Sequence, residues 1–137
     1  MSRPVAPPSG SPAPATVTLA GRQVELTPLA EAVADRYFAE FPGDLSRYGD
    51  AARAWEVHDT AYCLQWAILD VEGWDDLGRQ VAWLTGILRS RGFPLEQLAR
   101  NLELAADVVG QRLADGGAVA ARLRSSAAGV RASPEPP

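Results

Sequence analysis

Lysine is absent from this sequence of 137 residues, and cysteine and histidine occur only once each, as Cys63 and His58. A P-loop needs a lysine beside its glycines to bind nucleotide phosphates, so that motif is excluded. One cysteine cannot form an intramolecular disulfide, and one cysteine with one histidine cannot supply the three or four ligands of a structural zinc site. Cys63 lies in an apolar stretch, which predicts a buried, unreactive thiol. We therefore expect no metal site and no catalytic residue belonging to a known motif.

Long apolar runs are also missing, since no stretch reaches the ~18 residues of a membrane-spanning helix. The first residues contain Arg3 but lack the apolar segment of a secretory signal. The net charge is −4, and the arginines are scattered and form no basic stripe of the kind that binds nucleic acid. We expect a cytoplasmic protein that binds neither nucleic acid nor membranes. The use of arginine alone as the basic residue indicates a GC-rich genome or, alternatively, selection for bidentate contacts with anions.

What is present favours helices. Hydrophobic residues make up 47% of the chain, and alanine, leucine and valine dominate this set. Three parts can be distinguished: a disordered, proline-rich leader with an extended arm over 1–26, a helical domain over 27–124, and a disordered tail over 125–137. Apolar residues alternate within 16–26, a pattern that also fits a short hairpin.

Apolar residues recur every three or four positions in four segments of the helical domain. We predict helices over 27–41, 50–71, 74–91 and 95–113. The first is expected to begin with Thr27 as its cap, and the third to end at Gly92 in the left-handed conformation. Residues 44–49 are predicted to be a connector, and 118–125 a frayed final turn. Short connections make neighbouring helices antiparallel, so the predicted fold is an all-α, antiparallel four-helix bundle.

The second predicted helix carries the densest group of unusual side chains. Five of them share roughly one face: Trp55, His58, Tyr62, Gln65 and Trp66. Aromatic rings mixed with a few polar groups are typical of ligand pockets in helical bundles. The alternative is a core position, in which the polar atoms of His58 and Tyr62 are satisfied internally.

His58 is also a candidate axial ligand for haem. A catalytic relay through His58 is not expected, because Glu56 and Asp59 stand two positions before it and one after it, and such neighbours point away from it on a helix. Asn101 stands among apolar residues of the fourth predicted helix, and two interpretations stay open: that it reaches the His58 region or that it faces solvent. Arg79 and Gln80 are further candidates for a polar patch.

Small residues recur at four-residue steps on the third predicted helix, at Gly78, Ala82 and Gly86. Glycine within a helix costs about 1 kcal/mol relative to alanine. Two aligned glycines therefore predict that another helix packs very close to this face, either within the chain or from a second subunit.

One stretch, over about 50–110, resembles a known class of helical domain. The resemblance is carried by these residues: His58, Tyr62, Leu64, Leu77, Val81, Ala82, Trp83, Leu84, Leu88, Arg91, Gly92, Pro94, Leu98 and Leu102. The pattern is similar to the helical domains that precede cobalamin-binding or signalling domains in bacterial sensor and regulator proteins. This implies a regulatory module that passes a change through helix packing. The chain has no Asp-x-His-x-x-Gly cobalamin-ligating motif, so the resemblance corresponds to the helical half alone.

Three functional hypotheses follow. The first is a non-enzymatic regulatory or protein-interaction module of a bacterial cytoplasm, with a protein partner or a second copy of the chain bound through helix packing. The alternative is a small-ligand or haem sensor with its pocket around His58. The third, a small enzyme or an accessory subunit of one, needs titratable groups that converge from different helices.

Overall fold

The computed structural model describes residues 11–133, and this part of the chain forms a short hairpin followed by six helices. The elements in chain order are β1 (Thr16–Leu19), β2 (Arg22–Glu25), α1 (Leu26–Glu40), α2 (Gly43–Tyr48), α3 (Ala52–Val71), α4 (Leu77–Ser90), α5 (Leu95–Arg112) and α6 (Gly117–Arg131). The outer parts of the predicted leader and tail, 1–10 and 134–137, lie outside the described residues.

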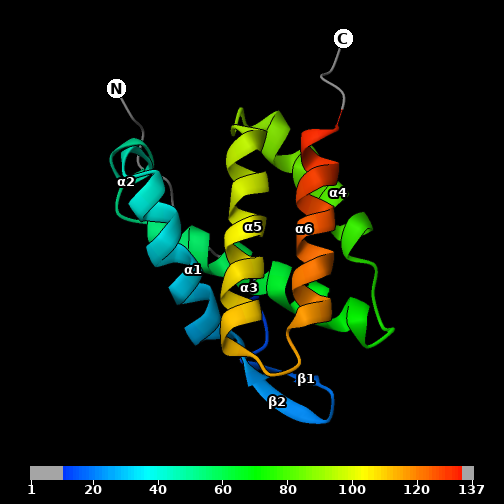
Figure 1. Cartoon of the computed structure of the whole chain (residues 1–137). Helices are drawn as coiled ribbons and strands as arrows, with labels where there is room; N and C mark the ends of the chain where they lie inside the picture. The colour runs from blue at the N-terminus through cyan, green and yellow to red at the C-terminus, as the bar shows by residue number, and fades with distance from the viewer. Residues whose placement is uncertain (1–10, 134–137) are drawn as a thin grey trace.

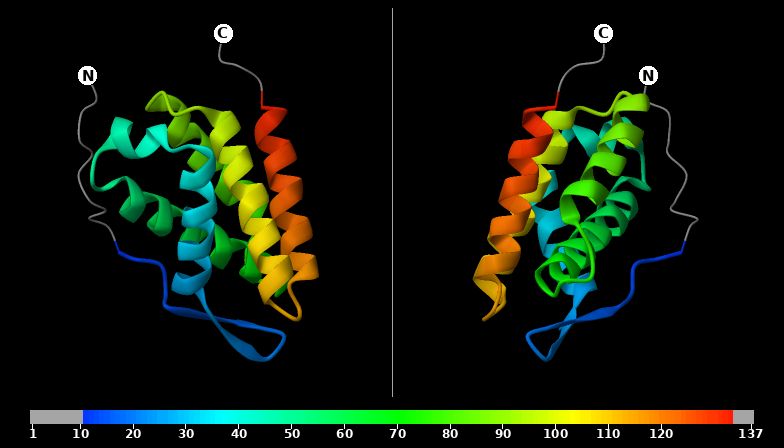
Figure 2. Two further views of the ribbon diagram at one scale, coloured as in Figure 1. Left: turned by 60° about the vertical axis from the view of Figure 1, so that its left-hand side comes forward. Right: turned by 90° about the vertical axis from the view of Figure 1, so that its right-hand side faces the viewer.

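The helices form two layers. Figure 1 shows α5 and α6 side by side and antiparallel, with α1 next to α5, while α3 crosses behind them and α4 lies behind α6. The two views of Figure 2 show the hairpin beneath one end of these helices. Fully buried side chains from both layers meet between them, among them Val33, Leu64, Ile68, Leu102 and Leu123. No helix within residues 11–133 is long and apolar enough to cross a membrane.

The alternation over 16–26 forms a two-stranded antiparallel hairpin, in which Val17 pairs with Val24. Both of these side chains are buried against the helices, whereas their strand neighbours are exposed. The turn passes through Ala20 and Gly21, which both have positive φ. The hairpin is tied to the helices because the Ala20 amide donates a hydrogen bond to the Glu72 carboxylate at 2.9 Å.

Six helices replace the four that the sequence predicts. The additional α2 lies in the predicted connector over 44–49, and α6 continues to Arg131 through residues predicted to be a disordered tail from 125. The helix α6 is stable there because Leu123, Ala127 and Val130 are buried on the face that packs against the other helices. Residues 11–133 fit the all-α class broadly, and with six helices and a small sheet they do not confirm a simple four-helix bundle.

The boundaries of α4 are set by caps. Asp76 is its N-cap and accepts a hydrogen bond from the Arg79 amide at 3.1 Å, while Asp70 accepts one from the Leu77 amide at 2.8 Å. The helix consequently begins at Leu77, not at 74 as predicted, and Trp74 is 82% exposed instead of belonging to the apolar seam. The prediction for Gly92 is confirmed, since its φ of 73° is left-handed directly after the helix.

The start of α1 also differs from the prediction. The strand β2 continues directly into the helix, so Glu25 is the N-cap and no side chain caps the first turn. Thr27 therefore lies inside the helix and does not cap it, while Pro28 occupies its first turn, where a missing amide proton costs little.

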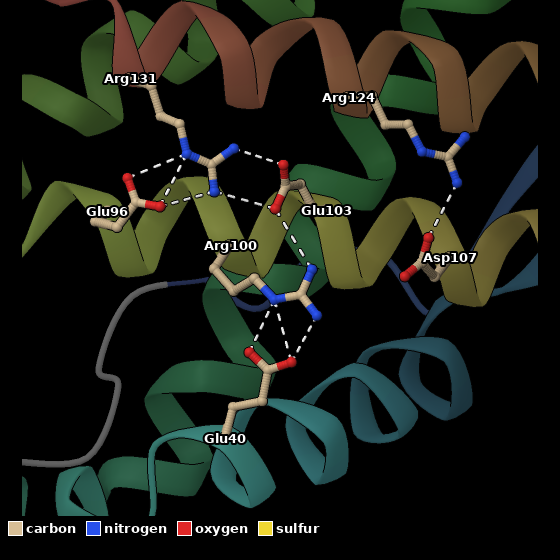
Figure 3. A network of polar contacts seen from close by, with 7 residues as sticks. All are labelled: Glu40, Glu96, Arg100, Glu103, Asp107, Arg124 and Arg131. Atoms are coloured by element: carbon tan, nitrogen blue, oxygen red, sulfur yellow. Dashed lines mark hydrogen bonds and ion pairs between the residues drawn. The ribbon is translucent and has the colours of Figure 1, made fainter.

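A network of ion pairs joins three helices on the outside of the molecule (Figure 3). Arg131 of α6 contacts Glu96 and Glu103 of α5, and Arg100 of α5 contacts Glu40 of α1 as well as Glu103. Arg131 holds the pKa of Glu103 below its usual value. The network joins α6, whose second half the sequence predicts to be a disordered tail, to α5 and, through Arg100, to α1.

Candidate functional site

A cavity of about 300 Å³ lies where α1, α2, α3, α4 and α5 meet; we call it the central cavity. Its walls are formed by Tyr37, Phe38, Asp44, Tyr48, Ala52, Trp55, Glu56, Asp59, Cys63, Leu84, Leu88, Arg91, Phe93, Gln97, Leu98 and Asn101. Five of these residues are aromatic, and they come from α1, α2, α3 and the loop after α4. The short helix α2 contributes Asp44 and Tyr48 to the wall, and the Tyr48 ring lies 6.1 Å from that of Phe93.

One polar group in the wall links three elements. Asp44 of α2 is buried, and its carboxylate accepts hydrogen bonds from the Tyr37 hydroxyl and from Gln97 Nε2, the latter at 2.8 Å. Gln97 Nε2 also lies 2.8 Å from the Tyr37 hydroxyl oxygen. Burial and the Asp44 carboxylate raise the pKa of Tyr37 well above its usual value. Tyr37 therefore stays protonated and holds Asp44 in place.

A second polar group consists of Glu56 and Asn101, which line the cavity, and Thr60, which contacts both. Thr60 Oγ1 lies 3.0 Å from Glu56 Oε2 and 3.0 Å from the amide group of Asn101. Thr60 and Asn101 are buried. Burial raises the pKa of Glu56 to about 8, although its hydrogen bond with Thr60 opposes the rise. At neutral pH this carboxyl therefore holds a proton in much of the population.

The two orientations of the Asn101 amide match the two states of Glu56. With Glu56 ionised, the amide nitrogen faces the carboxylate at 2.9 and 3.2 Å, and the amide oxygen accepts from Thr60. With Glu56 protonated, the amide nitrogen donates to Thr60 Oγ1 at 3.0 Å, and the amide oxygen can accept the carboxyl proton. The buried Asn101 can thus satisfy Glu56 with or without its proton.

The third carboxylate of the cavity, Asp59, lies 3.1 Å from His58 Nδ1. The expectation that these neighbours point apart on the helix is wrong, because the two flexible side chains turn toward each other at the surface of α3. Burial raises the pKa of Asp59 above its usual value, and the hydrogen bond from His58 opposes this rise.

Four of the five residues singled out in the sequence, all but Gln65, line a second hollow that adjoins the central cavity; we call it the aromatic groove. It has a volume of about 420 Å³ and is lined by Ser11, Trp55, His58, Asp59, Tyr62, Trp66, Trp83, Leu84, Ile87, Leu88 and Arg91. Trp55 borders both hollows, while Gln65 is partly exposed and lines neither.

Aromatic rings follow one another along this groove. The ring centroids lie 5.6 Å apart for Trp55 and His58, 5.2 Å for His58 and Tyr62, and 5.8 Å for Tyr62 and Trp66. The N-terminal segment reaches the same groove, because the Tyr62 hydroxyl donates to the Ser11 carbonyl. His58 Nε2 is buried and has no hydrogen-bond partner among residues 11–133. The sequence therefore located one concave surface, but not the central cavity that adjoins it.

Most of the central cavity was missed by sequence reasoning. Gln97 lies 60 and 53 positions after Tyr37 and Asp44, so no local pattern indicates that the three side chains meet. A signal for Glu56 did exist, because Glu56 and Thr60 fall at four-residue spacing on the same stripe of α3 as the buried Ala52 and Cys63. Polar residues that interrupt a buried stripe are candidates for a site. Of the two interpretations of Asn101, exposure to solvent is wrong because the residue is buried, and its side chain contacts Thr60 rather than His58.

The small-residue stripe of α4, which the sequence predicts to pack closely against another helix, contacts no helix within residues 11–133. Gly78, Ala82 and Gly86 are all exposed, and a Cβ built on Gly86 would meet nothing within 4 Å. No helix of the described chain packs there, so packing within the chain is wrong as an explanation of this small-residue stripe. Arg79 is exposed at the start of α4, and Gln80 hydrogen-bonds Asp75, so neither lines the hollows described above.

Two further kinds of site can be examined within residues 11–133: a reactive cysteine and a cluster of metal ligands. Cys63 is fully buried, and burial raises the pKa of its thiol far above its usual value, as expected for an inert side chain. No group of three or more histidine, cysteine, aspartate or glutamate side chains in this part of the chain is arranged to hold a metal ion. Compared with known proteins, the chain matches no protein-family model, no curated protein and no solved structure.

Proposed function

We propose that this chain is a non-enzymatic ligand-binding module that acts as a sensor, with a small organic molecule held in the central cavity. The observation that carries the proposal is the cavity itself, whose volume of about 300 Å³ lies at the lower end of the range for ligand pockets. Its wall is mainly aromatic and aliphatic, with a few polar groups in fixed positions, as in such pockets generally. The ligand is therefore smaller than a typical drug molecule.

A sensing role follows from where the walls come from. Five helices contribute to the cavity, and Asp44, Tyr37 and Gln97 already tie three of them together by hydrogen bonds. An occupant that contacts these walls stabilises one arrangement of the helices over others. Such a change in helix packing is what a regulatory domain passes to its partner.

The cavity can be tested by filling it. Ala52 is buried in the cavity wall near the start of α3, whereas Ala54 is exposed on the same helix. Ala52→Leu should keep the fold and lose bound ligand, while Ala54→Leu should keep both. The measurement is native mass spectrometry of the protein purified from its own host, with an absorbance spectrum that tests for haem in the same sample. The proposal fails if no small molecule accompanies the wild-type chain and none from a fragment library raises its melting temperature. It fails equally if Ala52→Leu binds as the wild type does.

A second candidate function, association of two copies through α4, is favoured by a separate observation. Trp83 is 61% exposed on this helix, close to the open stripe of Gly78, Ala82 and Gly86. Tryptophan is among the residues that most often carry binding energy in protein interfaces. Sedimentation velocity should show a dimer that Trp83→Ala converts to monomer. A monomeric wild-type chain would rule out this homodimer.

A further inference from the structure

We infer that the central cavity selects a small organic cation, such as a quaternary ammonium compound, through its aromatic walls and its unpaired carboxylates. This inference rests on the proposed function, because it names the chemical class of the ligand for the same cavity. It rests on three properties of the cavity wall: the excess of acidic over basic residues, the aromatic rings, and the burial of the Glu56 carboxyl group.

The charge of the cavity wall is unbalanced. Three acidic residues, Asp44, Glu56 and Asp59, line it, whereas Arg91 is the only basic lining residue among positions 11–133, and Arg91 is exposed. Within residues 11–133, neither Asp44 nor Glu56 forms an ion pair with a basic side chain, and the contact of Asp59 is with His58. Carboxylates taken out of water without a cationic partner are costly to keep ionised. A cation in the cavity supplies the missing partner.

The aromatic wall suits the same ligand. Tyr37 and Phe38 come from α1, Tyr48 from α2, Trp55 from α3, and Phe93 from the loop before α5. Aromatic faces attract cations through their negative quadrupole, and cages of several rings are the usual way in which proteins recognise quaternary ammonium groups. A neutral ligand of the same shape gains the apolar contact with these rings but not this attraction.

The burial of the Glu56 carboxyl group couples the binding of a cation to the loss of a proton from this group. Without a ligand its pKa is about 8, so near neutral pH it is largely protonated. A cation favours the ionised form, and its binding therefore releases a proton from Glu56. The Asn101 amide can turn to donate to the new carboxylate, so the buried hydrogen bonds stay satisfied. On α3 the charged and titratable groups near Glu56 are Arg53, Asp59 and Cys63, and His58 contacts Asp59. From other elements they are Asp44 on α2, Tyr37 on α1 and Arg91 after α4, whereas α5 contributes the uncharged Gln97 and Asn101 to the cavity wall.

The test is calorimetric titration of the full chain with choline and with its neutral isostere, 3,3-dimethylbutan-1-ol. Choline keeps its charge at every pH used, so any pH dependence belongs to the protein. Choline should bind at least about tenfold more tightly than the isostere. Below the pKa of Glu56, the affinity for choline should increase about tenfold for each unit by which the pH is raised, and it should level off above about 8. Titration in two buffers of different ionisation enthalpy should show proton release near neutral pH.

Two variants separate the role of Glu56 from a general effect of charge. Glu56→Gln keeps the shape and the contact with Thr60 but cannot ionise, so it should lose at least about tenfold in choline affinity and lose the pH dependence. Glu31→Gln removes an exposed carboxylate of α1 and should bind as the wild type does. If Glu56→Gln does not fold, the comparison of choline with its isostere still decides the question.

The outcomes distinguish the two proposals. Equal binding of the isostere and choline overturns the cationic ligand but leaves a ligand-binding cavity. The same conclusion holds if neither probe binds but native mass spectrometry finds a neutral molecule bound to the wild type and not to Ala52→Leu. The cationic ligand is then overturned, and the ligand-binding cavity is kept. Failure of both probes with no bound molecule of any kind overturns the cationic ligand and the proposed function together.

Discussion

Replacing Glu56 by glutamine should abolish a fall in stability that the wild-type chain undergoes as the pH rises from 4.5 to about 8. The ordinary pKa of this carboxyl is 4.5, and burial raises it to about 8 in the folded protein. Within this window the folded protein keeps a proton on Glu56 that the unfolded chain has released. Raising the pH therefore favours unfolding, and the stabilising effect of the proton is lost by the time the pH passes about 8.

The size of the effect follows from the width of this window. Each pH unit contributes at most about 1.4 kcal/mol for one group, so the ceiling over the whole window is about 5 kcal/mol. The carboxyl borders a cavity, and water that enters it lowers the cost of ionisation, so a difference of about 3 kcal/mol is the expected scale. Glutamine cannot ionise and keeps the polar contact with Thr60, so its variant should lack this contribution.

The assay is urea unfolding, followed by circular dichroism, at several pH values across this window. Asp59 also has a raised pKa, and Asp70 and Glu103 have lowered ones, so the wild-type profile alone contains several contributions. The difference between wild type and Glu56→Gln isolates one of them, and Glu31→Gln serves as the exposed control. Parallel profiles for wild type and Glu56→Gln would refute the reasoning.

Two further predictions concern the α5–α6 unit. A Cβ on Gly116 would lie 2.4 Å from the Val109 carbonyl oxygen, so Gly116→Ala should cost about 2–3 kcal/mol in urea unfolding. A Cβ on Gly117 would meet nothing within 4 Å, so Gly117→Ala should be neutral or stabilising by up to about 1 kcal/mol. Equal effects of the two substitutions would contradict this account of the turn between α5 and α6. Arg131→Gln breaks two ion pairs and should lower the melting temperature more than Arg124→Gln, which breaks one. The difference between the melting temperatures of the two variants should decrease in molar salt, because salt screens the ion pairs. If salt leaves this difference unchanged, packing rather than charge holds α6 in place.

The sequence predicted the helices whose buried side chains are large. In α4 the buried Leu77, Val81 and Leu84 recur at three- and four-residue steps, and this helix was placed within a few residues. The end of α6 was missed because its buried face beyond Leu123 consists of Ala127 and Val130, a pattern too weak to distinguish from a tail. Each small side chain buries little apolar area and contributes little to stability by itself. Whether such a face is buried depends on the helices that pack against it, which the local sequence does not show.

The aromatic groove could be predicted for a similar reason. Trp55, His58, Tyr62 and Trp66 belong to one helix, so periodicity alone places them together. The central cavity could not be predicted, because its walls come from five helices and the position of α2 depends on tertiary contacts such as that of Asp44. Local patterns assign residues to faces, and they do not say which faces meet.

The ion pairs of Figure 3 also bear on the order in which the fold assembles. Glu103 and Arg131 are 28 positions apart, whereas Glu40 and Arg100 are separated by 60. Closing the longer loop costs roughly 0.7 kcal/mol more in chain entropy. The helical hairpin of α5 and α6 can therefore form early, with α1 joining it later. This hairpin, which already contains the cavity wall of α5, can then act as the template on which the other cavity-forming helices, α1 to α4, assemble.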